Sequence, residues 1–338
     1  MTAKMNGFAL LSAIVAFWQN AGHAGETPPA AERKLRFTAT DQKHASAWQK
    51  QARNKLFEFL KLSDLVQADL GARDGRPRVE FKVNVKSSAA AKGGKFTRYD
   101  LEMNSTPTRR IPVVLTIPAG EGRFPAVVCI HGHGGNRNIV HAGESIYGGF
   151  ALELANRGCA TIATEVGQHN VYEKDRALMG ERLWDVMRCV SYLTSRPEVD
   201  AGRIGCAGLS LGGEMAMWLG AMDSRVQATV SSGFLTFTRN MLHGHCMCWD
   251  FPGLRENFDF PDVYSLIAPR RLMCQNGRKD PIFAWKLAEA AMGEIKQAYR
   301  CFDLEERAVL QLHDGEHVFD VGPAVQFLVK ALAPSPAK

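Results

Sequence analysis

From residue 126 onward, short apolar runs alternate with longer stretches in which apolar residues recur at helical spacing. The run 126–130 (Ala-Val-Val-Cys-Ile) has no polar residue, which is typical of a strand covered on both faces. Similar patterns predict strands at 160–164, 203–209, 228–232, 271–275 and 308–312, and helices at 149–157, 179–195, 212–222, 281–299 and 323–332. This alternation favours an α/β fold with a mostly parallel sheet and helices on both faces.

The pattern before residue 126 is different. Residues 44–62 carry apolar side chains on one helical face, and residues 79–86 alternate strictly between apolar and polar. Strict alternation predicts a half-buried antiparallel strand. We expect it to pair with 96–103 across a polar loop at 87–94, and a further strand to follow at 111–117. These antiparallel strands would extend one edge of the sheet.

The two patterns divide the chain. We expect residues 25–104 to form an N-terminal helix and edge-strand extension, and residues 105–338 to form the α/β domain, with an irregular insertion at 234–262. Pockets in open α/β sheets lie at the carboxyl ends of the strands. Residues that directly follow the strands are therefore the first candidates for chemistry.

Residues 1–24 have the pattern of a signal peptide. Lys4 gives a weakly positive start, 8–18 is a short apolar run, and Gly-His-Ala at 22–24 suits cleavage after Ala24. The apolar run is shorter than the about 20 residues that a membrane span needs. We expect a periplasmic or secreted protein with no membrane span in the mature chain.

Composition adds few constraints. The 338-residue chain is 46% hydrophobic with a net charge of +6, which suits a globular protein with a large core. Basic residues are most frequent between 33 and 110, where a solvated surface is the simplest interpretation and a surface for an acidic polysaccharide is the alternative. No basic stripe interleaved with aromatic residues accompanies them, so nucleic acid is not an expected partner.

The segment 208–212 (Gly-Leu-Ser-Leu-Gly) carries the strongest chemical signal. It joins a predicted strand to a predicted helix, the setting in which the serine of a G-x-S-x-G motif is a nucleophile. The glycines let strand and helix approach closely, and the helix N-terminus favours negative charge near the serine. We predict Ser210 as the nucleophile; a serine that only caps the helix is the alternative.

A serine nucleophile needs a base, and the base needs an acid that fixes its tautomer. In this setting they follow the serine in the order acid, then histidine. Asp280 follows the predicted strand 271–275, and His317 follows the predicted strand 308–312. We predict these two as acid and base. The rivals are His313 for the base, and Glu165 and Asp314 for the acid.

The tetrahedral intermediate needs preorganised N–H donors. One is the backbone of Leu211, directly after the nucleophile. The other is expected from the turn 131–135 (His-Gly-His-Gly-Gly), where we choose the His133 amide, with Gly132 beside it. The histidines His131, His133 and His141 could also suggest a metal site, but this role does not require one.

The insertion 234–262 holds two further candidates. Residues 243–248 (His-Gly-His-Cys-Met-Cys) are rich in soft ligands. Ligands at i and i+2 rarely share a tetrahedral ion, however, and the sequence offers no evident distant partner pair, so we expect no metal and no cofactor. We expect instead a loop over the substrate, with Trp249 and Phe251 as an apolar wall and Glu165 on the same rim. Cys246 and Cys248, with Cys301, are the cysteines expected outside the core.

Residues 105–330 resemble the α/β-hydrolase superfamily. The elbow 208–213, the segment from Cys246-Met247-Cys248 to Pro252-Gly253-Leu254, and 266–270 (Leu-Ile-Ala-Pro-Arg) are similar to exported bacterial esterases related to acetyl xylan esterases and dienelactone hydrolases. The resemblance implies ester hydrolysis, with acylated plant polysaccharide as a substrate, and implies Ser210, Asp280 and His317 as the triad. This chain departs from dienelactone hydrolases in having serine rather than cysteine as nucleophile, and from acetyl xylan esterases at His133.

We therefore expect a serine carboxylesterase acting on a small ester or an acylated carbohydrate. A serine exopeptidase of prolyl-oligopeptidase type is one alternative, because Gly213 also suits that elbow. Such enzymes usually carry a large N-terminal propeller, for which the roughly 100 residues before the sheet leave no room. A non-catalytic binding protein on the same fold is the other alternative, and the intact triad candidates argue against it.

Overall fold

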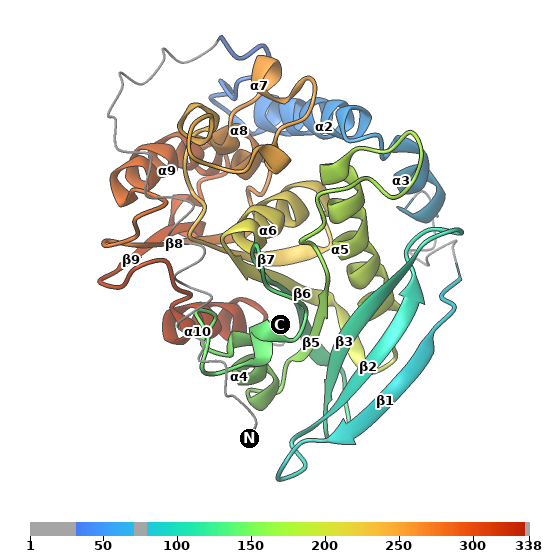
Figure 1. Ribbon diagram of the computed structural model, residues 1–338. Helices are drawn as coiled ribbons and strands as arrows, with labels where there is room; N and C mark the ends of the chain where they lie inside the picture. Colours follow the sequence, from blue (N-terminus) through green and yellow to red (C-terminus); the bar gives the residue numbers. More distant parts are fainter. Residues whose placement is uncertain (1–31, 71–79, 335–338) are drawn as a thin grey trace, which may run out of the picture.

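A computed structural model describes residues 32–70 and 80–334 of the chain. The predicted signal peptide lies outside the described residues. A nine-stranded sheet forms the centre of the molecule, in the order β1-β2-β3-β5-β4-β6-β7-β8-β9 (Figure 1). Its strands are β1 (Asn84–Ala90), β2 (Phe96–Asn104), β3 (Arg110–Pro118), β4 (Phe124–Ile130), β5 (Ala160–Thr164), β6 (Val199–Leu209), β7 (Val226–Ser232), β8 (Arg271–Gly277) and β9 (Ala308–His313).

The sheet is parallel from β5 to β9, and the first three strands add an antiparallel edge. β1 pairs with β2, β2 with β3 and β3 with β5 in antiparallel register, whereas β4 pairs in parallel with both β5 and β6. The strands at the centre are buried on both faces because helices cover both sides. The mostly parallel sheet with antiparallel N-terminal edge strands confirms the predicted fold class.

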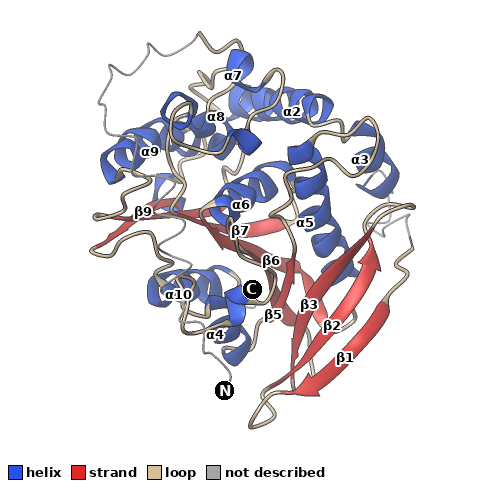
Figure 2. Ribbon diagram, in the orientation of Figure 1, coloured by secondary structure: helices blue, strands red, loops and turns tan. Residues whose placement is uncertain are grey.

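Helices form a layer on each side of the sheet (Figure 2). One core contains α4 (Phe150–Asn156) and α10 (Val321–Ala331), and the opposite core contains α5 (Leu178–Ser195), α6 (Leu211–Met222), α8 (Phe260–Ser265) and α9 (Trp285–Arg300). The remaining α-helices of the described chain are α2 (Gln42–Phe59), α3 (Ser63–Leu70) and α7 (Leu254–Asn257). Within these described residues, none of the helices combines the length and the apolar character of a membrane span.

The prediction of a half-buried strand at 79–86 is wrong. The strand runs over Asn84–Ala90 instead, and all of its residues are exposed. It lies at the outer edge of the sheet and pairs only with β2, and no layer covers it (Figure 1). The alternating segment overlaps the strand only at residues 84–86, and the small residues 87–90, which were assigned to a loop, complete the pairing with β2.

Candidate active site

A cavity of about 760 Å³ opens where β4, β6 and β7 end. Two of the residues that follow these strands, His133 and Ser210, line it, as does His317 beyond β9. The rest of the lining is mostly apolar and includes Ile146, Tyr147, Leu211, Phe234, Met241, Trp249, Ile282 and Phe283. The cavity thus lies at the carboxyl ends of the strands, as the fold class leads one to expect.

Ser210 occupies a sharp turn between β6 and α6. Its backbone has φ 62° and ψ −125°, a conformation that L residues rarely adopt, and its amide donates to the Ser232 carbonyl at 2.9 Å. The turn is possible only with glycines beside it. A Cβ on Gly208 would collide with the Gly212 carbonyl, and one on Gly212 would collide with the Ile130 carbonyl.

His317 is held by Asp280. The distance between His317 Nδ1 and Asp280 Oδ2 is 2.8 Å, and the Asp280 side chain is 1% exposed. The other carboxylate oxygen of Asp280 accepts hydrogen bonds from the amides of Ile282 (2.8 Å) and Phe283 (3.0 Å). These amides fix the carboxylate, and the carboxylate in turn fixes the imidazole with Nδ1 as the protonated nitrogen.

The second ring nitrogen of His317 remains for chemistry. Nε2 is buried and has no hydrogen-bond partner among the described residues. Phe283 stacks on the ring, with centroids 5.7 Å apart. On another side Gly233 gives clearance, since a Cβ there would lie 2.9 Å from His317 Cε1. The ring is therefore confined on several sides, with an unused nitrogen in the cavity that Ser210 lines.

The backbone donors beside Ser210 differ in availability. Leu211 is the first residue of α6, and the amides of the first helical turn have no acceptor within the helix. The Gly132 amide, in contrast, donates to the Tyr147 hydroxyl at 2.7 Å. Gly132 is thus engaged, and Leu211 and His133 are the predicted donors that remain. Tyr147 itself keeps its hydroxyl proton for a second contact in the cavity.

Comparisons with known proteins find similarity to esterases. Residues 78–241 match the acetyl xylan esterase (AXE1) family model. A solved structure described as a putative acetyl xylan esterase from Bacteroides fragilis is similar with a TM-score of 0.66 at 17% identity, over 92% of this chain and 83% of that one. The chain therefore shares the fold of these α/β-hydrolase esterases. A glucuronoyl esterase from Solibacter usitatus is similar too, with a TM-score of 0.65 at 18% identity, over 91% of this chain and 99% of that one.

A curated relative of this chain is the putative hydrolase YtaP of Bacillus subtilis (strain 168). The two are 30% identical over 177 residues, which is 44% of this chain and 58% of the relative. The aligned region therefore spans little more than half of that relative. At under 25% identity, the solved structures establish the fold. The resemblance to acetyl xylan esterases that the sequence suggested is confirmed.

The rival candidates for the acid and the base lie away from the cavity lining. His313 ends β9, and its Nδ1 accepts from the Gly315 amide at 3.2 Å. The Asp314 side chain is 92% exposed and faces Arg278. Glu165 lies in a neighbouring hollow, where its carboxylate is 2.7 Å from the Arg137 guanidinium. None of the three contacts His317.

The residues predicted to contact substrate are separated by the structure. Trp249 lines the Ser210 cavity. Phe251 instead packs in the core beside Trp218, with ring centroids 5.7 Å apart, and Glu165 is bound to Arg137. Burial raises the pKa of Glu165, but its contacts with His131 and Arg137 outweigh burial and lower the value to about 2. Glu165 is therefore a structural anion, and it is not a wall of this cavity.

Sequence reasoning missed three residues at the site. Tyr147 holds the Gly132 amide, as described above. Glu214 lines the cavity, and burial raises the pKa of its carboxyl to about 7; the visible signal was a lone acid in an apolar helix, one turn after Ser210. His169 lies in the loop after β5. The same loop contains Glu165, which the sequence did point to.

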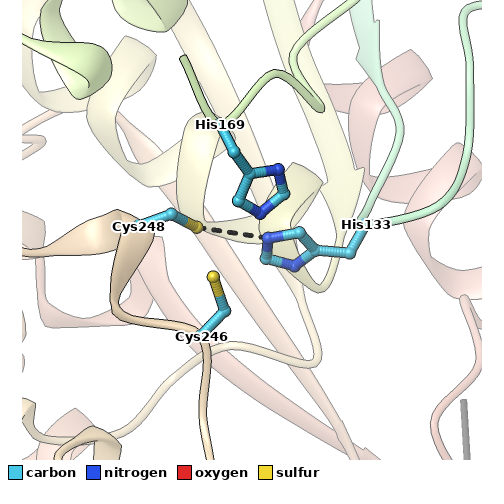
Figure 3. Close-up of side chains that lie close together, drawn as sticks. All are labelled: His133, His169, Cys246 and Cys248. Carbon is cyan, nitrogen blue, oxygen red and sulfur yellow. Dashed lines mark hydrogen bonds between the residues drawn. The ribbon is translucent and has the colours of Figure 1, made fainter. Parts of the chain in front are cut away.

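The histidine trio of the sequence analysis does not come together. The two nitrogens of His131 are occupied, Nδ1 by the Gly132 carbonyl (2.8 Å) and Nε2 by the Val166 amide (3.1 Å). His141 Nε2 lies 3.4 Å from the Thr161 hydroxyl. His133 instead meets His169, Cys246 and Cys248 (Figure 3).

Proposed function

We propose that this chain is a serine carboxylesterase in which Ser210, His317 and Asp280 act together through an acyl-enzyme. The observation that carries the proposal is that Ser210 stands on a strained elbow in the same cavity as His317, whose Nδ1 is 2.8 Å from Asp280. A nucleophile, an orienting acid and a base, in this order along the chain, support this chemistry.

The reaction uses the unoccupied nitrogen of His317. Nε2 takes the proton of Ser210 Oγ as Oγ attacks the ester carbonyl carbon, and the proton then passes to the departing alcohol. In the second half, Nε2 takes a proton from water as the water oxygen attacks the acyl carbon. Nε2 then returns that proton to Ser210 Oγ as the acid leaves, which restores the free enzyme. Asp280 stabilises the imidazolium that forms in each half.

The negative charge that develops on the carbonyl oxygen needs donors beside Ser210. We assign this role to the amides of Leu211 and His133, of which Leu211 is at the N-terminus of α6, where the helix dipole also favours the charge. The Tyr147 hydroxyl supports the same turn because it fixes the Gly132 amide at 2.7 Å. We assign Gly132 a positioning role.

The cavity suits a neutral ester. Its volume of about 760 Å³ is in the usual range for small-molecule sites. No lysine or arginine is among the described residues that line it, and its carboxyl group is that of Glu214. An acyl group that carries a carboxylate would lack a counter-ion there. Together with the match to the acetyl xylan esterase model, this supports a short neutral acyl group, such as acetyl, on a carbohydrate.

The basic residues of the N-terminal part do not contribute to this site. Lys86 lies 3.6 Å from Glu102, and Arg98 lies 3.4 Å from Asp100. All four are on β1 and β2, at the far edge of the sheet from β9. They support a solvated surface rather than a substrate surface. Export to the periplasm or beyond remains a prediction from residues 1–24.

A substrate panel tests the proposal. Purified protein is assayed with p-nitrophenyl acetate, acetylated xylo-oligosaccharides, a glucuronoyl ester and an aminoacyl p-nitroanilide, each beside the Ser210→Ala variant. We expect turnover of the acetyl esters, little or none of the amide, and loss of at least about a thousandfold in kcat for Ser210→Ala. Cleavage of the amide in preference to every ester would make the chain a peptidase, and no cleavage at all would leave a binding protein.

A further inference from the structure

Four side chains with metal-ligating atoms converge beside the Ser210 cavity. His133 comes from the turn after β4, His169 from the loop after β5, and Cys246 and Cys248 from the insertion after β7. One ligand atom from each lies within 4.8 Å of all the others. Figure 3 shows both rings and both sulfur atoms directed at one point. Segments far apart in the sequence thus supply one compact donor set.

We infer that His133, His169, Cys246 and Cys248 bind one zinc ion. Zinc takes thiolate sulfur and imidazole nitrogen in tetrahedral geometry, at bond lengths of roughly 2.3 and 2.0 Å, which places the donors roughly 3.3–3.8 Å from each other. His133 Nε2 and Cys248 Sγ are already 3.2 Å apart. The widest separation in the set, at most 4.8 Å, needs a contraction of roughly 1 Å, which side-chain rotation supplies.

The donor types select the metal. Two thiols and two imidazoles with no carboxylate suit zinc and other soft or borderline ions, and do not suit calcium or magnesium, which take oxygen ligands. Four protein ligands fill all positions of a tetrahedral ion, which is the pattern of a structural rather than a catalytic site. The inference therefore adds no step to the ester hydrolysis, and it does not depend on it.

The spacing of the two cysteines is compatible with a shared ion. Cys246 has extended backbone (φ −63°, ψ 131°), and Cys248 belongs to the short 3-10 turn Met247–Trp249. Met247, the residue between them, is 42% exposed. Figure 3 shows both sulfur atoms on the side of the two histidines.

A buried arginine lies next to two of the segments that carry ligands. Arg182 on α5 donates through Nε to the Gln168 carbonyl at 3.1 Å, which holds the backbone directly before His169. The same guanidinium lies beside Cys248. It therefore fixes one ligand loop and places a positive charge beside the sulfur of another, where it offsets the charge of a thiolate.

The position of the four ligands beside the Ser210 cavity indicates a structural role for the ion. His133, Cys246 and Cys248 also line the Ser210 cavity, and His133 is our candidate oxyanion donor. Zinc would join the oxyanion turn to the insertion that carries Trp249, and would thereby hold the wall of the cavity at a fixed distance from Ser210. Its role would be to position two cavity walls.

Metal binding tests the inference directly. The full-length protein is purified under reducing conditions, stripped with a chelator, and titrated with Zn²⁺ against a chromophoric competitor, with elemental analysis of the loaded protein. We expect one zinc per chain. His169→Ala and the double variant Cys246→Ser/Cys248→Ser should each bind zinc at least about 100-fold more weakly.

Two matched controls exclude non-specific binding. His243→Ala removes a histidine of the same insertion, and Cys301→Ser removes a partly exposed thiol at the end of α9. Both variants should retain full affinity. Ser210→Ala should also bind zinc unchanged, so failure of the proposed function and failure of the zinc site are distinguishable. Cobalt substitution should give the thiolate charge-transfer and intense visible bands of a tetrahedral site, and these bands should be absent from the double variant.

Several outcomes would overturn the inference. The parent protein could bind zinc no more tightly than the double variant does, or the His169→Ala variant could retain zinc. Cobalt bands typical of an octahedral site would also contradict it. All the cysteines are free thiols here. If mass spectrometry of the untreated protein finds Cys246 and Cys248 joined as a disulfide, and the reduced protein takes up no zinc, the pair is a redox pair and the zinc site is refuted.

Discussion

Asp280 has the most constrained side chain of the proposed triad. Replacing it by asparagine changes the hydrogen bond to His317 while the size of the side chain stays the same. Asp280→Asn preserves the shape, but an amide that donates to His317 Nδ1 favours the wrong tautomer and cannot stabilise the imidazolium. We expect kcat for p-nitrophenyl acetate to fall by about a thousandfold or more, with a small change in KM. Steady-state kinetics of the purified variant measures this.

Asp314→Asn is the matched control. Asp314 was a rival for the acid, and its side chain is 92% exposed. We expect its kcat to remain within about twofold of the parent, since it contacts neither Ser210 nor His317. A larger loss in Asp314→Asn than in Asp280→Asn would reverse the assignment of the acid.

Glu165 predicts a pH dependence of stability. Its pKa is lowered from the ordinary value of 4.5 to about 2 in the folded protein. A carboxyl with a depressed folded pKa contributes stability above its unfolded pKa and loses that contribution as pH falls from about 4.5 towards 2. Glu165→Gln has no such contribution to lose. We expect the difference in unfolding free energy between parent and variant to be largest at pH 7 and to shrink by pH 3.

Urea unfolding of both proteins at pH 7, 4.5 and 3 measures this difference. A difference that stays constant across the series would mean that the Glu165 carboxylate gains nothing from Arg137. Esterase activity of Glu165→Gln at pH 7 should be close to that of the parent, because Glu165 lies in the neighbouring hollow.

At the scale of elements, the junction after β7 is the most sensitive to change. Gly233 has φ +58°, and a Cβ there would lie 2.9 Å from His317 Cε1. Gly233→Ala therefore carries a left-handed backbone cost of roughly 1–2 kcal/mol and also displaces the imidazole. We expect reduced stability and a loss of activity of at least about tenfold at a temperature where the variant is fully folded.

Gly158→Ala isolates the backbone effect. Gly158 has φ +80°, but nothing lies within 4 Å of a Cβ at this position. We expect a similar loss of stability, measured by urea unfolding, with activity close to that of the parent. Equal activity in the two folded variants would show that Gly233 does not position His317.

The elements that the sequence predicted well are those whose burial is complete. β4, β6 and β7 are covered on both faces, so their apolar runs reveal them directly. α9 begins at Trp285 rather than at 281, because the amides of Ile282 and Phe283 turn toward Asp280 instead of starting a helix. The bounds of β1 were not predicted, because an exposed edge strand needs no apolar pattern.

The residues of the candidate site also fall into those that the sequence could predict and those that it could not. Ser210, Asp280 and His317 could be predicted because each follows a strand of a parallel sheet, and the fold alone brings such positions to one rim. The donor set with His169 could not be predicted, since its members meet only when three loops fold against one another. The same holds for Phe251, whose aromatic character fits a cavity wall and a core equally well.

At the scale of the whole molecule, the N-terminal part is anchored to the α/β domain through α2. Gln49 donates to the carbonyl groups of Ser265 (3.2 Å) and Ala268 (2.7 Å), and Arg53 donates to that of Ala221 (2.8 Å). Leu56, on the same helix, is fully buried in the main core. We propose that the predicted extension 25–104 folds together with the rest as one unit.

Leu56→Ala tests this unity. If α2 completes the main core, the substitution should lower the free energy of unfolding of the whole protein by about 2–5 kcal/mol in a single transition. Leu152→Ala, at a side chain that is 37% exposed on α4, should cost less than about 1 kcal/mol. Urea unfolding followed by tryptophan fluorescence measures both. An unchanged midpoint for Leu56→Ala would make α2 an independent appendage.

The central claim is that Ser210 is an activated nucleophile. The most direct measurement is the reaction of the intact protein with a fluorophosphonate, followed by peptide mapping with mass spectrometry. We predict one adduct per chain, on Ser210, that is absent from Ser210→Ala and forms much more slowly in Asp280→Asn. A protein that stays unmodified, or an adduct that persists on another residue in Ser210→Ala, would contradict the account.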